Sequence, residues 1–162
     1  MTKPMLSATL RAFISGPVAI NVASHDRMLL PSIARAYGCR LCPDGNRITV
    51  FLSARSAAAV LGDLRSGAPI AVVFCLPSTH ATLQFKSASA NVLPLAPGDR
   101  EIMRAYATAF QAEIAGIGFD GAFAAGLVAP AGDDAVAVEF APTAVFDQTP
   151  GPEAGKPLEI AA

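Results

Sequence analysis

Apolar and polar residues alternate along several short stretches of this chain, which is the pattern of β-strands that bury one face. In the first stretch, Val18, Ile20 and Val22 share one face, and smaller or polar residues share the other. The same period of two recurs over residues 32–41, 48–52, 70–76, 82–95 and 135–146. Residues 87–90 are expected to be a weak or bulged point, and Pro142 interrupts the last stretch. The pattern therefore predicts six strands.

Other stretches carry apolar residues three or four positions apart, which is the spacing of a helix face. They predict helices over about 6–14, 56–65, 99–118 and 121–128. Gly67 is a natural end for the second helix, and Asp99 is the expected N-cap of the third. No βαβ alternation with a Gly-rich phosphate loop is present. Six strands joined mainly by short turns predict a mostly β fold, an antiparallel barrel with flanking helices.

Length and composition place these elements in one domain. The chain has 162 residues, of which 52% are apolar and 15% charged, so a large buried core or a subunit interface is expected. We expect the barrel to occupy residues 1–146 and a Pro/Gly-rich tail, extended or disordered, to occupy residues 147–162. The apolar runs are too short for a membrane span, and no signal peptide is expected. Three cysteines argue against a disulfide framework, so a cytoplasmic location is expected.

Charge is distributed unevenly between the two halves. The whole chain carries a net charge of −1, so no nucleic-acid partner is expected. Residues 25–86 hold seven basic and three acidic side chains, whereas residues 87–162 hold three basic and ten acidic ones. The basic first half indicates a local anion site, although ordinary solvated charges would give the same count.

Two groups of residues are candidates for that site. Ser53-Ala54-Arg55-Ser56 lies where a strand meets a helix start, and free N–H groups there favour an anion. The alternative is that Ser53 or Ser56 only caps the helix. Arg35 lies on an apolar strand face, so it needs either an anionic partner or a route to solvent, and Arg40 points to the opposite face.

These residues occur in an order that resembles the flavin-binding strands of the pyridoxamine 5'-phosphate oxidase family. The resemblance rests on residues 31–35, on Arg40 and on residues 49–53, and it extends over about 16–95, the sixth strand and residues 146–152. It implies an FMN-binding split β-barrel. By resemblance, the cofactor-binding residues are Arg35 and Arg40 on one strand, Ser53, Arg55 and Ser56 at the phosphate, and Gln84 at the flavin ring, with Thr82 as the competitor for the ring position.

The resemblance also implies a function. It implies a homodimer that holds FMN non-covalently at its interface and acts as an oxidoreductase on a small molecule of unknown identity. The Arg/His signature that recognises pyridoxal phosphate in the true oxidases has no match in residues 142–162, so a flavin-binding relative is expected rather than that oxidase. The alternative is a non-enzymatic split-barrel module that binds haem, a deazaflavin or no cofactor.

Cysteine and histidine residues offer a further alternative. Cys39 and Cys42 form a C-x-x-C pair, which only Cys75, His25 or His80 could complete as a zinc site. A strand would place Cys39 and Cys42 on opposite faces, so no metal is expected. We expect Cys39 and Cys75 to be small apolar core residues. His80 is a candidate proton donor or haem ligand, or else an ordinary loop residue.

Overall fold

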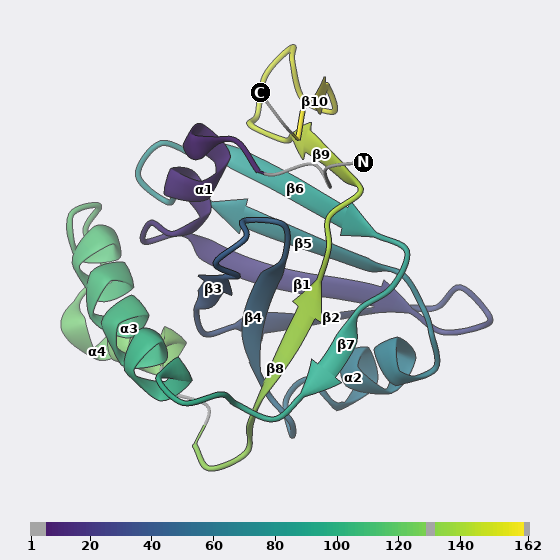
Figure 1. Ribbon diagram of the computed structural model, residues 1–162. Coiled ribbons are helices and arrows are strands. Elements are labelled where there is room, and N and C mark those ends of the chain that lie inside the picture. The colour runs from purple at the N-terminus through teal and green to yellow at the C-terminus, as the bar shows by residue number, and fades with distance from the viewer. Residues whose placement is uncertain (1–5, 129–131, 161–162) are drawn as a thin grey trace.

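Two antiparallel sheets and four helices form the fold of the computed structural model, which describes residues 6–128 and 132–160. The first sheet has the order β10 (Pro157–Leu158), β9 (Ala144–Asp147), β6 (Thr82–Ser87), β5 (Ile70–Cys75), β1 (Ala19–His25) and β2 (Pro31–Ala36). The second has the order β3 (Cys39–Leu41), β4 (Ile48–Ser53), β8 (Ala135–Phe140) and β7 (Asn91–Leu93). The helices are α1 (Ala8–Ile14), α2 (Ala58–Arg65), α3 (Asp99–Ala115) and α4 (Gly121–Leu127). Figure 1 shows the second sheet crossing in front of the first.

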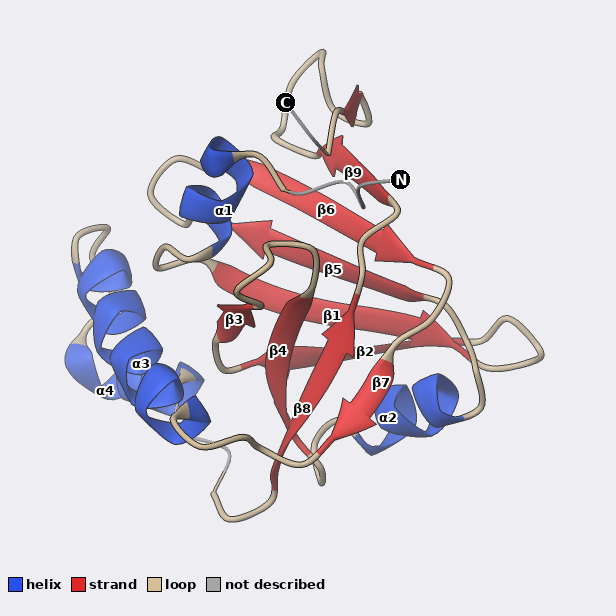
Figure 2. Cartoon of the chain, in the orientation of Figure 1, coloured by secondary structure: helices blue, strands red, loops and turns tan. Residues whose placement is uncertain are grey.

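The predicted fold class is confirmed; nine of the ten strands in the described residues come from the six predicted stretches, and β10 lies in the expected tail. Three of the six predicted strands each pass from one sheet to the other and break at the crossing. The chain turns at Gly38 between β2 and β3, at residues 88–90 between β6 and β7, and at Pro142 between β8 and β9. Figure 2 shows these crossings as loops between strands of different sheets. The sequence marked residues 87–90 and Pro142 as weak points, and two of the breaks fall there. The break at Gly38 was not predicted, because the period of two continues through that bend.

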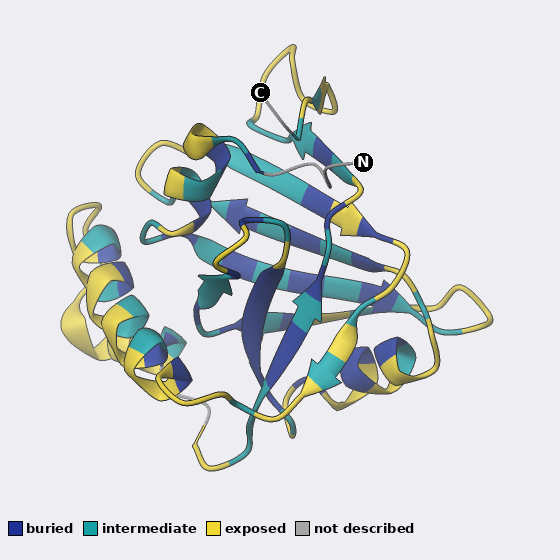
Figure 3. Cartoon of the chain, viewed as in Figure 1, coloured by how far each residue is buried: buried dark blue, intermediate teal, exposed yellow. Residues whose placement is uncertain are grey.

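The core lies between the facing sides of the two sheets. Every residue of β4 is buried, and β1 and β5 bury every second residue. The rings of Phe74 and Phe85 meet edge to face at 5.5 Å, and both side chains are fully buried. Helix α2 adds Val60, Leu61 and Leu64 to the same cluster. Figure 3 shows this buried layer continuing along β4 and β8.

The helix boundaries correct one predicted cap. Gly98, with φ of 90°, occupies the N-cap position of α3, and Asp99 is the first residue of the helix. The Asp99 carboxylate still accepts a hydrogen bond from the Ala96 N–H at 2.8 Å, so it closes the turn before the helix. Helix α3 ends at Ala115 rather than at about residue 118. None of the described helices has the length and apolar character needed to cross a membrane.

The C-terminal segment is more ordered than the sequence indicates. Residues 148–160 form turns and strand β10, which pairs with β9. The Gly155 N–H donates to the Asp147 carbonyl at 2.7 Å, and the Ser7 N–H donates to the Ile160 carbonyl at 3.0 Å. The expectation of an extended or disordered tail is therefore wrong for these residues; residues 161–162 lie outside the described part.

We predict that Phe74→Ala lowers the free energy of unfolding by about 3–5 kcal/mol, because it leaves a cavity beside Phe85 in the densest part of the core. Phe123→Ala is the matched control, since that side chain is 51% exposed, and it is expected to lose well under half as much. Urea denaturation of both variants measures the difference. Equal losses would contradict this assignment of the core.

Candidate functional site

The candidate site begins with the outer face of the first sheet, which is only half buried. In β1, Ile20 and Val22 point into the core, whereas Ala19, Asn21 and Ala23 are half-exposed on the opposite face. The same alternation holds in β5. Because residues paired across antiparallel strands share a face, the register identifies the neighbours on this outer surface.

One row of paired residues crosses this outer face and contains two of the predicted cofactor residues. The row runs through Arg35, Asn21, Val73, Gln84 and Phe146 in consecutive strands. Arg35 and Gln84 are three strand spacings apart, which is roughly 14 Å. Thr82 lies two residues before Gln84 and shares its face. The structure thus places Arg35, Thr82 and Gln84 on one surface, and the sequence had given no sign that Asn21 lies between them.

Arg35 is the most unusual side chain on this surface. Its Nε and Nη2 atoms are buried and have no hydrogen-bond partner within the described part of the chain. The guanidinium lies 4.8 Å from the centre of the Phe110 ring on α3. Tyr106, also on α3, donates its hydroxyl to the Val18 carbonyl at 2.9 Å, and burial raises the pKa of Tyr106 to about 12. Arg35 therefore keeps unused donors at Nε and Nη2, beside the Phe110 ring and close to the Tyr106 hydroxyl, where its charge partly offsets the rise in pKa that burial causes.

Arg40 is engaged in an ion pair instead. Its Nε lies 2.7 Å from Asp99 Oδ1, and its Nη2 lies 3.3 Å from Asp99 Oδ2. The Asp99 side chain is 1% exposed. The hydrogen bond to Asp99 raises the pKa of the Arg40 guanidinium above its ordinary value. This two-point pair ties β3 to the start of α3, so Arg40 has a structural task apart from any cofactor.

The turn at residues 53–56 already holds a carboxylate. Asp134 Oδ2 accepts hydrogen bonds from the Ser53 hydroxyl at 2.7 Å and from the Arg55 N–H at 3.0 Å. The Ser53 Oγ in turn accepts from the Ser56 N–H at 3.2 Å. The Arg55 N–H, then the Ser53 hydroxyl, hold the pKa of Asp134 below its ordinary 3.8. Sequence reasoning found the turn but missed Asp134, which lies about 80 residues later in the chain.

The β6 residues contact the C-terminal turn. Gln84 Oε1 accepts from Gln148 Nε2 at 3.3 Å, and the Thr82 N–H donates to Thr149 Oγ1 at 3.0 Å. The Thr82 hydroxyl donates to the His80 carbonyl at 2.8 Å. His80 is exposed in the turn between β5 and β6, with φ of 60°. These contacts hold Thr82 and Gln84 in place along the outer face.

The cysteines have separate environments. The Cys39 thiol donates to the Ile14 carbonyl at 3.0 Å, and burial raises its pKa to about 12. Cys42 is buried and contacts Glu139, and Cys75 lies on the outer face of β5. Within residues 6–128 and 132–160, no three His, Cys, Asp or Glu side chains are placed to share a metal ion.

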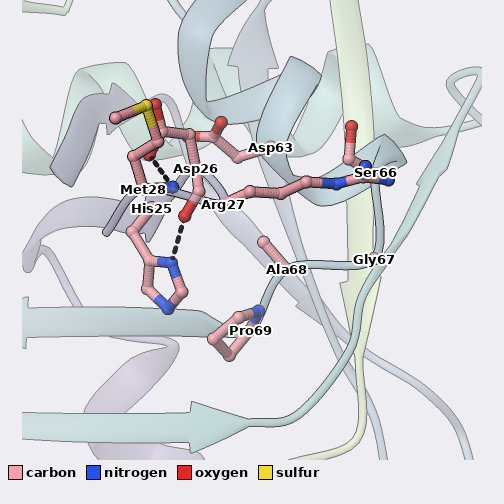
Figure 4. Close-up of a pocket in the computed structure, with 9 residues that line it drawn as sticks. All are labelled: His25, Asp26, Arg27, Met28, Asp63, Ser66, Gly67, Ala68 and Pro69. Atoms are coloured by element: carbon pink, nitrogen blue, oxygen red, sulfur yellow. Dashed lines mark hydrogen bonds between the residues drawn. The ribbon is translucent and has the colours of Figure 1, made fainter. Parts of the chain in front are cut away.

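A surface pocket of about 480 Å³ lies elsewhere, between the β1–β2 turn and the C-terminal end of α2. Figure 4 shows Arg27 extending across it toward Ser66. Its acidic groups already have partners: Asp26 Oδ1 accepts from the Met28 and Leu30 N–H groups, and Asp63 accepts from the Ser32 hydroxyl. None of the predicted site residues lines this pocket.

Comparison with solved structures identifies the fold. The HupZ protein of Group A Streptococcus aligns with 93% of this chain and 100% of its own, at 14% identity and a TM-score of 0.54. A candidate pyridoxamine 5'-phosphate oxidase from Lactobacillus delbrueckii aligns over 90% of this chain and 95% of its own, at 12% identity and a TM-score of 0.51. An F420 reductase aligns over 83% of this chain and 94% of its own, at 13% identity and a TM-score of 0.51. No family model and no curated protein matches the sequence.

These matches show that the chain has the split-barrel fold of the pyridoxamine 5'-phosphate oxidase-like proteins. They leave the cofactor unresolved, because one fold supports different cofactor chemistries. Among the described residues, two of the places predicted to bind FMN, Arg35 and the turn at residues 53–56, differ in whether their donors are free. Arg35 has buried donors without an acceptor, whereas the Ser53 hydroxyl and the Arg55 N–H already donate to Asp134.

We predict that Arg40→Met lowers the free energy of unfolding by about 2–3 kcal/mol, because it leaves the buried Asp99 carboxylate without its cation. Arg47→Met is the matched control: Arg47 pairs with Glu139, but its side chain is 45% exposed, so a loss below about 1 kcal/mol is expected. Chemical denaturation measures both. A stable Arg40→Met protein with weakened cofactor binding would instead support the role that the family resemblance implies.

Proposed function

We propose that this protein is an FMN-binding flavoprotein, a homodimeric oxidoreductase that holds FMN non-covalently at its interface and acts on a small molecule. The observation that carries the proposal is the pair of buried Arg35 nitrogens, Nε and Nη2, which have no acceptor among the described residues and lie on the same sheet face as Gln84.

A guanidinium that is removed from water needs acceptors for its N–H groups. The stacking of Arg35 on Phe110 compensates part of its charge but accepts no hydrogen bond from Nε or Nη2. A flavin mononucleotide offers carbonyl oxygens on its ring and anionic oxygens on its phosphate. Arg35 would bind one of these groups, and the Gln84 amide, which both donates and accepts, would orient another part of the cofactor. Bound FMN would supply the hydride or electron transfer.

The outer face of the first sheet supports a second copy of the chain as the partner. Its half-exposed residues include small and apolar side chains: Ala23, Ala71, Val73 and Cys75. Strand β2 ends the sheet, and Ile33 on that strand is 72% exposed. A sheet face of this kind is stabilised by a covering layer. A symmetric partner would cover it with the same surface and would bring a second Arg35–Gln84 row to the interface.

Haem and deazaflavin remain the alternatives to FMN. A deazaflavin is an alternative because an F420 reductase has a similar fold. Flavin and deazaflavin also present similar ring edges to a protein. The visible absorbance spectrum of the purified protein distinguishes FMN from haem, because flavin and haem absorb in different bands.

We predict that Arg35→Met weakens FMN binding at least tenfold, the effect of losing one charge-assisted hydrogen bond. Removing an unpaired buried charge should leave the Tm of the cofactor-free protein unchanged or raise it. The exposed Arg65→Met carries the same charge change and should bind FMN as the wild type does. Fluorescence titration with FMN and a thermal melt measure both effects. A colourless wild-type protein that takes up no added FMN would contradict the flavin proposal.

We predict that Ala71→Arg converts the dimer to a monomer of about 16.6 kDa, because Ala71 lies on the outer sheet face, between Ala23 and Lys86 in the register. An arginine buried at this position of the interface would face either the same arginine of the partner or an apolar side chain, and both contacts destabilise the dimer. Ala59→Arg is the matched control on the exposed side of α2 and should leave the dimer intact. Light scattering after size exclusion measures the mass. A monomeric wild type would disprove the dimer.

A further inference from the structure

The turn that the family resemblance assigns to the FMN phosphate contains an anion that belongs to the chain itself. The Asp134 carboxylate accepts from the Ser53 hydroxyl at 2.7 Å and from the Arg55 N–H at 3.0 Å. The Ala54 N–H donates to the Asp134 backbone carbonyl at 2.9 Å. Thus one hydroxyl and two consecutive N–H groups at this turn have acceptors, and all of the acceptors come from one residue.

A phosphate monoester at this place would need the same donors. Hydroxyl and backbone N–H groups at the start of a helix are the usual ligands of a phosphate. It would also meet the Asp134 carboxylate, which is ionised at neutral pH as aspartates ordinarily are, and the hydrogen bonds from Arg55 and Ser53 lower its pKa further. Two anions that compete for one set of donors repel each other. A phosphate at the Ser53 hydroxyl and the Arg55 N–H would therefore have to displace the carboxylate.

We propose that Asp134 is a specificity-determining residue: because of it, a flavin that carries a phosphate binds no more tightly than a flavin without one. This inference rests on the flavin-binding function proposed above and concerns one end of that site. The binding free energy for the flavin then comes from the ring and from Arg35, and the phosphate contributes little. Riboflavin and FMN differ only in that phosphate, so their relative affinity isolates the effect of Asp134.

The experiment measures the dissociation constants of FMN and riboflavin by fluorescence for four proteins: wild type, Asp134→Ala, Asp134→Asn and Asp133→Ala. The wild type is expected to bind both flavins within about threefold. Asp134→Ala frees the Ser53 hydroxyl and the Arg55 N–H, so FMN binding should tighten at least tenfold. Riboflavin binding should stay unchanged. Asp133→Ala makes the same charge change at the exposed neighbouring residue and should behave as the wild type does.

Inorganic phosphate provides a second probe that needs no flavin. In Asp134→Ala, the Ser53 hydroxyl and the Arg55 N–H lose their acceptor, so phosphate should raise the Tm of this variant relative to sodium chloride of equal ionic strength. The wild type and Asp133→Ala should show no such rise. Asp134→Asn keeps an acceptor oxygen without the charge, so it reports folding if Asp134→Ala is unstable, and it should give an intermediate gain.

The outcomes separate the two proposals. If no variant binds either flavin but Asp134→Ala gains a phosphate-dependent Tm, the flavin function is wrong and the anion competition at Asp134 stands. If the wild type already prefers FMN more than tenfold, or if neither Asp134 variant gains affinity for FMN or phosphate, the role of Asp134 is overturned while flavin binding is retained.

Discussion

The whole structure depends on the packing of two sheets face to face around one apolar layer. Strand β4 lies at the centre of that layer, with all six of its residues buried. Its neighbours β3 and β8 hold it in the second sheet, and the Phe74 and Phe85 rings lie in the same core on the first sheet. Because three segments of the chain contribute strands to both sheets, the sheets cannot separate without bending those segments. The outer face of the first sheet, where the candidate site lies, is therefore held by the core behind it.

The charged residues of the candidate site differ in whether another residue of the chain neutralises them. Arg40 has Asp99, and the pair joins the second sheet to α3. The turn at residues 53–56 has Asp134. Arg35 stacks on the Phe110 ring and lies close enough to the Tyr106 hydroxyl that its charge partly offsets the rise in the pKa of that group caused by burial, and within the described residues it keeps two buried nitrogens without an acceptor. A buried cation without an acceptor is costly for a folded chain, which is the physical ground for assigning it a role in binding.

The same division changes the picture of the cofactor site. From the sequence, the resemblance assigns Arg35 and Arg40 on one strand and Ser53, Arg55 and Ser56 at the phosphate to a single cofactor site. In the structure they form three groups: an outer sheet face with Arg35, Thr82 and Gln84, an ion pair at Arg40, and a turn closed by Asp134. Within the described residues, the first group combines buried donors that lack an acceptor with a half-exposed sheet face. A flavin site that is organised around the sheet face, with little contribution from the phosphate, follows from this arrangement.

The sequence by itself determined the elements that depend on local pattern. The period of two identified the strand-forming stretches, and helical spacing identified all four helices within a few residues, because side-chain direction repeats with the backbone geometry. It could not place Gly38 as a point where a strand changes sheets, since alternation continues through the bend. Nor could it indicate that Asp134 would meet Ser53 or that Asp99 would meet Arg40, because carboxylates far along the chain carry no local signal of their partners. Those pairings were decided by the tertiary structure, which brings distant segments together and determines which charges must share one small volume.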